Sequence, residues 1–420
     1  MTITLINLNG IITDFAASRN VSSSQQIQCL QCYNDGTKAS RIAKMLKLRM
    51  HKAGNGDCIS IVTESEFILI DGGTAQSFDN WKDQVIGQTS KLTKIIVTHI
   101  DNDHANGIIK LLEHAKCPEI ESILFNGAEQ LIGNLEIDNS TNPHIDRKLQ
   151  ALASEFSVSD NNTKIGYAEG TSLSYLLNSK NLKCNRIIGG QAIYREGLKS
   201  FEAGEIKFTI IGPEKSSLTE ITENWESKLN EKRIKPKIIN KAYYDAFETY
   251  ISNIKDLAPT NKISNTALYT IESLANEPFV EDASATNRSS FSFLIEYRDK
   301  RILYLGDCHA ETVISWLDSC GIDTIEVDAV KISHHGSKNN TSRTLLKRID
   351  SPRYMISTNG KSHGHPNLET LARIAVENRS RKTTILVNYN LDNIPAWFTE
   401  QLKTKYPNIT FEMDIYETEL

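Results

Sequence analysis

The chain has 420 residues, of which 39% are hydrophobic and 24% charged, as expected for a globular protein that can bury a sizeable core. Its net charge of −5 excludes a bulk basic attraction for nucleic acid, and no apolar run approaches the length of a membrane span. The first 20 residues lack the basic start and long apolar core of a secretory signal. We therefore expect a cytoplasmic protein with no membrane partner.

The N-terminal part of the chain divides at about residue 45. Residues 1–44 have weak hydrophobic periodicity and a polar middle, so we predict an extension outside a main domain of residues 45–420. Strand patterning begins at residues 46–50 and continues in two more apolar runs separated by turn signals, the first of them Gly54–Asp57. Short strands joined by tight turns predict an antiparallel meander.

A cluster of metal-binding residue types follows the next apolar strand, residues 94–97. His99, Asp101, Asp103 and His104 fall within six residues. Alternate positions of an extended loop point to the same side, so the first three can converge, and His104 follows at the turn. In the simplest structural alternative the aspartates only cap the following helix and His99 packs in the core. Four ligand types in six residues favour a metal site.

The remaining chain predicts two β-rich blocks. Residues 130–285 are mostly polar and helical in pattern, apart from a strand pair between Phe201 and Gly212, and we predict a cap insertion at about 130–285. Strand patterning resumes at 291–297, after which strands and helices alternate. Two β-rich blocks, each followed by helices, predict an α+β sandwich of two facing mixed sheets with helices outside.

More donor residues recur at later strand ends. Asp307 directly follows a buried strand, and its two carboxylate oxygens could bridge two cations. His334 and His335 follow a second strand, and His363 and His365 lie on a third loop of this kind. A single histidine is usually structural, but packing alone does not predict this repetition at three strand ends.

Five motifs together resemble the metallo-β-lactamase superfamily and, more narrowly, the hydrolase domain of ComEC-type DNA-uptake proteins and their free-standing bacterial relatives. They are Ile70-Asp71-Gly-Gly, Thr98-His-Ile-Asp-Asn-Asp-His104, Gly306-Asp307, His334-His-Gly-Ser337 and His363-Gly-His-Pro366. The resemblance covers about residues 46–126 and 286–390. It implies a metallo-β-lactamase-like αββα sandwich that binds two divalent metal ions, with zinc favoured and manganese also compatible with the ligands.

The resemblance also implies a role for each matching residue. His99 and Asp101 would hold one ion, Asp103 and His104 the other, with Asp307 between them and one of His334 and His335 completing the second site. The catalytic candidates are Asp103, Asp307 and His365, the last facing the leaving group or a phosphate oxygen. The candidates for orienting a ligand or contacting substrate are Asp71, Lys331, Ser337 and His363. For Lys331 and Ser337, a solvated position is an equally open alternative.

One ligand of the superfamily pattern has no counterpart in this sequence. A further histidine is usual in a loop that here reads Phe125-Asn126-Gly127, and an asparagine is a poor metal ligand. The first metal site is therefore expected to be weaker, to use water, or to prefer an oxygen-binding ion.

The expected activity is phosphodiesterase or nuclease hydrolysis of a nucleic acid or nucleotide by water activated at two metal ions. Two alternatives remain open at this point. The same centre could hydrolyse another ester class, as a lactonase does, or a centre that lacks one ligand could belong to a non-catalytic binding or sensor protein. Partner proteins encoded in the same operon are a further expectation.

Overall fold

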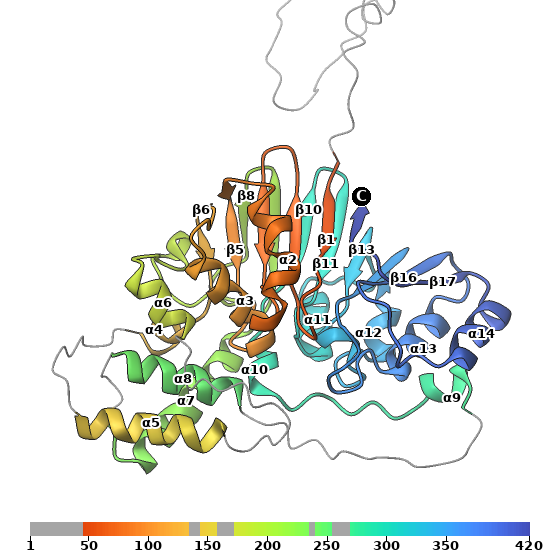
Figure 1. Cartoon of the computed structure of the whole chain (residues 1–420). Helices are drawn as coiled ribbons and strands as arrows, with labels where there is room; N and C mark the ends of the chain where they lie inside the picture. The colour runs from red at the N-terminus through yellow and green to blue at the C-terminus, as the bar shows by residue number, and fades with distance from the viewer. Residues whose placement is uncertain (1–44, 134–142, 158–171, 235–239, 254–268) are drawn as a thin grey trace, which may run out of the picture. The chain divides into compact units, whose positions relative to one another are not determined.

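The computed structural model describes residues 45–133, 143–157, 172–234, 240–253 and 269–420. The extension predicted for residues 1–44 lies outside these ranges and stays a prediction. Residues 45–420 form one unit, built on two large sheets (Figure 1).

The first sheet contains the predicted meander. Its six strands run in the order β18, β1, β2, β3, β5, β7. Their bounds are β18 Glu417–Glu419, β1 Lys47–Met50, β2 Ile59–Val62, β3 Phe67–Ile70, β5 Lys94–Ile96 and β7 Ile123–Leu124. The first three strands of the chain pair antiparallel, as predicted, whereas β3, β5 and β7 pair parallel. Parallel strands place their C-terminal ends at one edge, where the metal-binding residue types follow.

The second sheet has eight strands in the order β17, β16, β15, β13, β11, β10, β9, β8. Their bounds are β17 Ile409–Glu412, β16 Thr383–Val387, β15 Arg353–Ile356, β13 Ala329–Lys331, β11 Lys300–Tyr304, β10 Ser292–Tyr297, β9 Ile206–Gly212 and β8 Ser200–Ala203. Both β8 and β9 lie inside the range predicted as a cap, 130–285, and pair with β10 or with each other. Any cap therefore consists of the helices on either side of these strands, and its role stays a prediction.

Helices cover the outer faces of both sheets (Figure 1). The first half of the chain contributes α2 Phe78–Ile86, α3 Asn102–Glu113, α4 Ala128–Ile132, α5 Pro143–Ser157 and α6 Leu173–Ser179. The middle contributes α7 Lys215–Glu231, α8 Lys241–Ser252, α9 Ile271–Ala275 and α10 Ala285–Arg288. The last part contributes α11 Ala310–Ser319, α12 Arg343–Lys347, α13 Leu368–Glu377 and α14 Ala396–Lys405. Two short pairs, β4 Lys91–Leu92 with β6 Glu119–Ile120 and β12 Ile325–Glu326 with β14 Ile349–Asp350, complete the strands.

Alternation within the strands explains why the sheets are buried on both sides. In β3, Ile68 and Ile70 belong to the apolar layer between the sheets, whereas Leu69 packs in the layer under the helices. In β11, Ile302 joins the layer between the sheets and Leu303 the layer under the helices of the second sheet. Three apolar layers thus separate four structural layers, and the predicted αββα sandwich is confirmed.

Glu248 on α8 is a buried carboxyl group that lies away from the strand ends, and it should make the stability of the protein depend on pH. It is 2% exposed, and its carboxylate accepts the backbone N–H groups of Leu173 and Ser174, both at 2.7 Å, where α6 begins. Burial raises the pKa of Glu248 from 4.5 to about 7, because these hydrogen bonds offset only part of the desolvation. The folded chain then keeps a proton that the unfolded chain has lost, so stability should fall as pH rises from about 4.5 to 7, by on the order of 3 kcal/mol.

The measurement is urea unfolding between pH 4.5 and 8 for the wild type and Glu248→Gln. Glutamine does not titrate, so the variant should show a flatter dependence of the free energy of unfolding on pH within this window. Equal slopes for the two proteins would contradict the prediction.

Candidate metal centre

The donor residues meet where strands of both sheets end. Asp71 follows β3, His99 follows β5, Asp307 follows β11 and His335 follows β13. A backbone hydrogen bond from Phe291 to the carbonyl of Thr98, at 2.9 Å, joins the two halves beside these residues. The site is therefore assembled from segments more than 200 residues apart in sequence.

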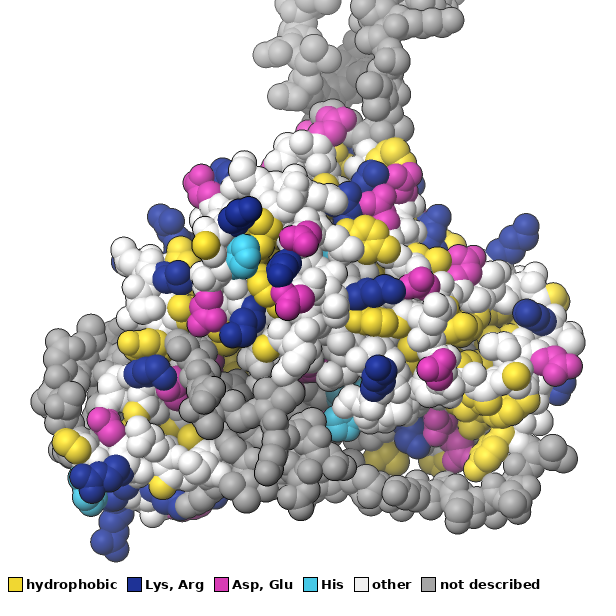
Figure 2. Space-filling view, viewed as in Figure 1, with side chains coloured by type: hydrophobic (Ala, Val, Ile, Leu, Met, Phe, Trp, Pro, Cys, Tyr) yellow, Lys and Arg dark blue, Asp and Glu magenta, His cyan; other side chains and the backbone are white. Residues whose placement is uncertain are grey.

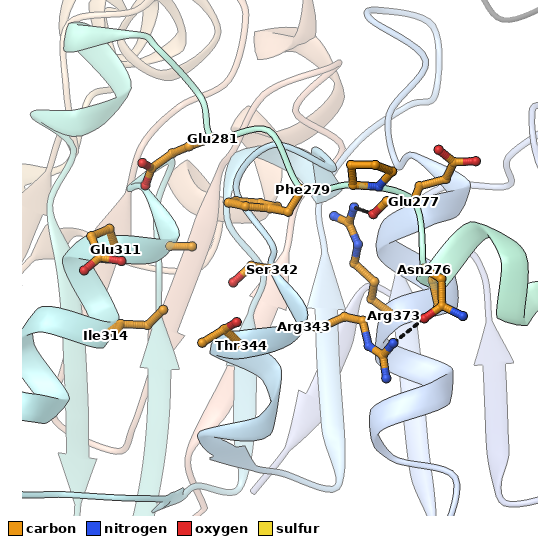
Figure 3. Close-up of a pocket in the computed structure, with 13 residues that line it drawn as sticks. Asn276, Glu277, Phe279, Glu281, Glu311, Ile314, Ser342, Arg343, Thr344 and Arg373 are labelled. Atoms are coloured by element: carbon orange, nitrogen blue, oxygen red, sulfur yellow. Dashed lines mark hydrogen bonds between the residues drawn. The ribbon is translucent and has the colours of Figure 1, made fainter.

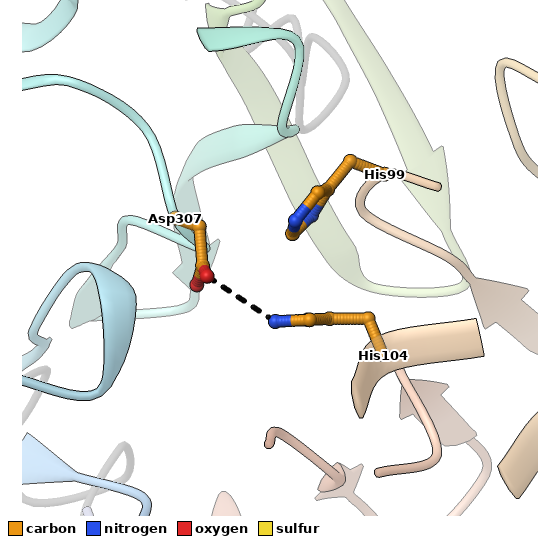
Figure 4. A group of neighbouring side chains, drawn as sticks. All are labelled: His99, His104 and Asp307. Atoms are coloured by element: carbon orange, nitrogen blue, oxygen red, sulfur yellow. Dashed lines mark ion pairs between the residues drawn. The ribbon is translucent and has the colours of Figure 1, made fainter. Parts of the chain in front are cut away.

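Among the described residues, His104 belongs to three groups of donors, one of them with Asp57 and Asp71. In the first, one donor atom each of His99, His104 and Asp307 lies within 4.8 Å of the others (Figure 4). Asp103, His104 and His335 form the second group under the same limit. His104 Nε2 lies 3.3 Å from Asp307 Oδ2, and His335 Nε2 lies 3.5 Å from the same oxygen. Asp307 thus stands between the two groups.

The nitrogens that face this centre lack hydrogen-bond partners. The Nε2 atoms of His99, His104 and His335 are buried and unpaired by hydrogen bonds, and so is Oδ1 of Asp307. Buried polar atoms are normally satisfied. A divalent cation accepts electron pairs from imidazole nitrogen and carboxylate oxygen together, so this donor set fits one, with zinc or manganese both suitable.

Asp71 lies behind two of these histidines. Its Oδ2 is 2.9 Å from His104 Nδ1, and its two oxygens accept the backbone N–H and the hydroxyl of Thr98, both at 2.7 Å. The Thr98 hydroxyl in turn lies 3.0 Å from His99 Nδ1. With a proton on each Nδ1, both Nε2 atoms present a lone pair to the centre.

The charges at the centre make metal binding depend on the protonation of its side chains. Burial lowers the pKa of His104, but the carboxylates of Asp307 and Asp71 outweigh it and raise that pKa well above the ordinary value. Burial likewise opposes ionisation of Asp307, yet His104 and His335 hold its pKa well below the usual range. A proton and a metal ion therefore compete for the same His104 nitrogen.

The structure distinguishes between His334 and His335, two adjacent candidates for a metal ligand that the sequence does not tell apart. His335 Nδ1 donates to the carbonyl of Ser357 at 3.0 Å, so its Nε2 is free to face Asp103 and Asp307, at 3.6 and 3.5 Å. His334 instead turns its Nδ1 to Asn340 Oδ1 at 2.9 Å and lies 3.5 Å from Asp282. Of the pair, His335 is the one placed to bind metal.

Asp101 and Asn126, the two positions discussed for the first ion, form hydrogen bonds with the backbone. Asp101 is the N-cap of α3 and accepts the backbone N–H of Asn102 at 2.6 Å. Among the described residues it joins none of the groups of three donors, because the chain turns into the helix at Asn102 and does not stay extended. Asn126 exchanges two hydrogen bonds with the backbone of Ile193, at 2.7 and 2.8 Å, so its amide is already paired.

The remaining predicted residues lie around the centre. His365 is 8% exposed, its Nδ1 has no hydrogen-bond partner, and its ring lies 5.2 Å from that of His334. His363 is exposed, with its ring 6.0 Å from His365. Ser337 is buried and accepts the backbone N–H of Asn339.

Lys331 is not solvated, contrary to one alternative from the sequence. It is 2% exposed and forms an ion pair with Asp57, a residue of the Gly54–Asp57 turn for which the sequence analysis predicted no role in the centre. Asp57 is fully buried, and it belongs to two donor groups, one with Asp307 and His335 and one with Asp71 and His104. The only signal in the sequence was a carboxylate immediately before an apolar strand.

A separate cavity of about 550 Å³ lies between α9, α11, α12 and α13 (Figure 3). Arg373 reaches its wall but is held by the carbonyls of Lys338, Thr341 and Glu277, at 2.6, 2.9 and 3.2 Å, and Arg343 donates to Asn276. None of the predicted site residues lines this cavity. It is therefore distinct from the metal centre.

Comparison with known families agrees with the geometry at the first sheet. The family model described as "Metallo-beta-lactamase superfamily" matches residues 51–124, which include Asp71, His99, Asp103 and His104. The chain contains a metallo-β-lactamase superfamily domain. No curated protein matches the chain. The narrower resemblance to ComEC-type hydrolases stays a prediction.

The solved structures that the chain matches include YhfI, a metallo-beta-lactamase fold protein from Bacillus subtilis. It is 10% identical, with a TM-score of 0.34 over 90% of this chain and 100% of that one. CmlA, a diiron beta-hydroxylase from Streptomyces venezuelae, is 11% identical, with a TM-score of 0.34 over 90% of this chain and 54% of that one. The chain thus spans about half the length of CmlA.

None of the helices within the described ranges is long and apolar enough to cross a membrane.

Proposed function

We propose that this protein is a metal-dependent hydrolase that cleaves phosphodiesters of nucleic acids or nucleotides with water activated at two divalent ions. The observation that carries the hydrolase proposal is the position of Asp307 between His104 and His335, with buried donor atoms that no hydrogen bond satisfies. The phosphodiester specificity is supported by the resemblance of the five sequence motifs, including the one around His335, to the DNA-uptake subgroup.

The charge of the centre supports two ions. The donor groups contain the four aspartates Asp57, Asp71, Asp103 and Asp307. Among the described residues, Lys331 is the only lysine or arginine that forms an ion pair with any of them. Burying this excess of negative charge is costly unless cations offset it. Lys331 offsets one of these four negative charges, and bound divalent ions would offset the rest.

The residues of the chain have separable tasks in this reaction. Bound divalent ions would supply a water of lowered pKa and stabilise the charge that develops on the phosphoryl oxygens. Asp71 keeps the Nε2 atoms of His99 and His104 directed at the centre. Asn55 donates to Asp103 Oδ2 at 2.7 Å and fixes that carboxylate. His365, beside His334, is placed to hydrogen-bond a phosphoryl or leaving-group oxygen.

The surface offers little other recognition of phosphate on the face shown in Figure 2. Lys and Arg side chains there are interspersed with Asp and Glu among the described residues. Among the described residues, no basic track crosses that face.

The test combines metal analysis with hydrolysis by the wild type, Asp103→Ala and the control Asp299→Ala. Asp299 is 84% exposed on the β10–β11 hairpin and serves as a matched aspartate outside the centre. We expect about two metal ions per chain and hydrolysis of bis-p-nitrophenyl phosphate and single-stranded DNA, with a loss of about 100-fold or more in Asp103→Ala only.

Other outcomes would redirect or end the proposal. Bound metal with turnover of carboxylic esters but not of phosphodiesters would assign the centre to another ester class. A wild type that binds no divalent metal would remove the proposed centre altogether.

A further inference from the structure

The turn Gly54–Asp57 packs directly against the metal-binding loop. A Cβ atom on Gly56 would lie 1.7 Å from the backbone oxygen of Asp103, so only glycine allows this approach. The Gly56 carbonyl accepts the Ser357 hydroxyl at 2.9 Å, and Asn55 donates to Asp103. The turn thus contacts donor-bearing segments from both sheets.

Asp57 stands behind His335 as Asp71 stands behind His104. Its Oδ1 lies 3.4 Å from His335 Nδ1, on the opposite side of the ring from the Nε2 that faces Asp307. Because the two ring nitrogens point in different directions, Asp57 can orient His335 without binding the same ion. His335 Nδ1 donates its proton to the Ser357 carbonyl, and the Asp57 carboxylate beside it attracts the same N–H electrostatically.

Lys331 connects Asp57 to the carboxylate between the two groups. Its ammonium pairs with Asp57, donates to the Gly306 carbonyl at 3.1 Å and lies 3.9 Å from Asp307 Oδ1. Burial would raise the pKa of Asp57, but the Lys331 charge outweighs it and lowers that pKa to about 2. A buried ion pair of this kind adds little net stability, since an apolar pair would serve as well. Its contacts with His335 and Asp307 suggest another use.

We propose that the turn Gly54–Asp57 is a positioning element of the metal centre, with Asp57 and Lys331 holding His335 and Asp307 in place and Asn55 holding Asp103. The inference rests on the metal centre of the proposed function. The turn Gly54–Asp57 is a loop of the first sheet, and it fixes two donors, His335 and Asp307, that the second sheet contributes. The ion pair crosses between the sheets at the point where the ligands must keep their spacing.

The test is titration of metal-free protein with Co²⁺, followed by the visible absorption of the bound ion, which reports its ligand geometry. We expect Asp57→Asn to bind Co²⁺ about 10- to 100-fold more weakly than the wild type and with a changed absorption spectrum. Glu248→Gln is the matched control, because it alters another fully buried carboxyl that touches none of the donors. It should change stability and leave Co²⁺ affinity and spectrum as in the wild type.

Each result has a defined consequence. Wild-type affinity and spectrum in Asp57→Asn would overturn the inference and leave the ion pair as a structural contact only. If Asp57→Asn does not fold, the neutral double variant Asp57→Asn/Lys331→Met, which buries no unpaired charge, takes its place with the same two outcomes. Absence of Co²⁺ binding to the wild type would overturn the proposed function as well, so the two failures are distinguishable.

Discussion

Asp307→Ala is expected to abolish paired metal binding and to reduce phosphodiester hydrolysis by about 1,000-fold or more, equivalent to about 4 kcal/mol of transition-state stabilisation. Asp307 lies 3.3 Å from His104 Nε2 and 3.5 Å from His335 Nε2, closer to both than Asp103, which lies at 3.8 and 3.6 Å. The removal of Asp307 takes a donor from the group with His99 and His104 and from the group with Asp57 and His335. Elemental analysis and initial rates on bis-p-nitrophenyl phosphate measure the two effects.

A matched variant separates this effect from a general loss of charge. Asp323→Ala removes an exposed aspartate from the same half of the chain and should keep metal content and rate. Retention of about two ions per chain by Asp307→Ala would show that Asp307 does not lie between the metals, and the assignment of the centre would then be wrong.

His335→Ala should lower the metal content, whereas His334→Ala should leave it unchanged. His335 directs Nε2 at Asp103 and Asp307, so its loss should reduce binding to one ion per chain and activity by about 100-fold or more. His334 Nδ1 contacts Asn340 and Asp282, and among the described residues His334 belongs to none of the donor groups, so His334→Ala should retain two ions.

Both variants are measured by elemental analysis after exchange into metal-free buffer, with circular dichroism as the control for folding. A loss of metal in His334→Ala and its retention in His335→Ala would reverse the assignment. Equal losses in both would mean that the packing of the shared loop, rather than one ligand, decides metal binding.

Much of the fold followed from local patterns in the sequence. Short apolar runs separated by turn signals predicted the meander of β1, β2 and β3, and their pairing is antiparallel as expected. Donor residues that follow apolar runs, such as His99 and Asp307, do lie at strand ends. Such signals are readable because hydrophobic period and residue type act over a few neighbouring residues.

The sequence was less informative where one local rule competed with another. Asp101 was expected to point with His99, but α3 begins at Asn102, and the cap of that helix takes the Asp101 carboxylate. Lys331 closes a strand, and its residue type suggested solvent or an anion. In a sandwich with both sheet faces covered, a strand-end lysine can instead be buried, as this one is.

The sequence by itself determined the strands, the αββα layers and the set of residue types that could hold metal. Only the tertiary structure decided which of them face one another. The partnership of Asp57 with Lys331, 274 positions apart, and the choice of His335 over His334 depend on contacts between the two sheets. No local pattern encodes such contacts, because they form only when both halves of the chain have packed around their shared apolar layer.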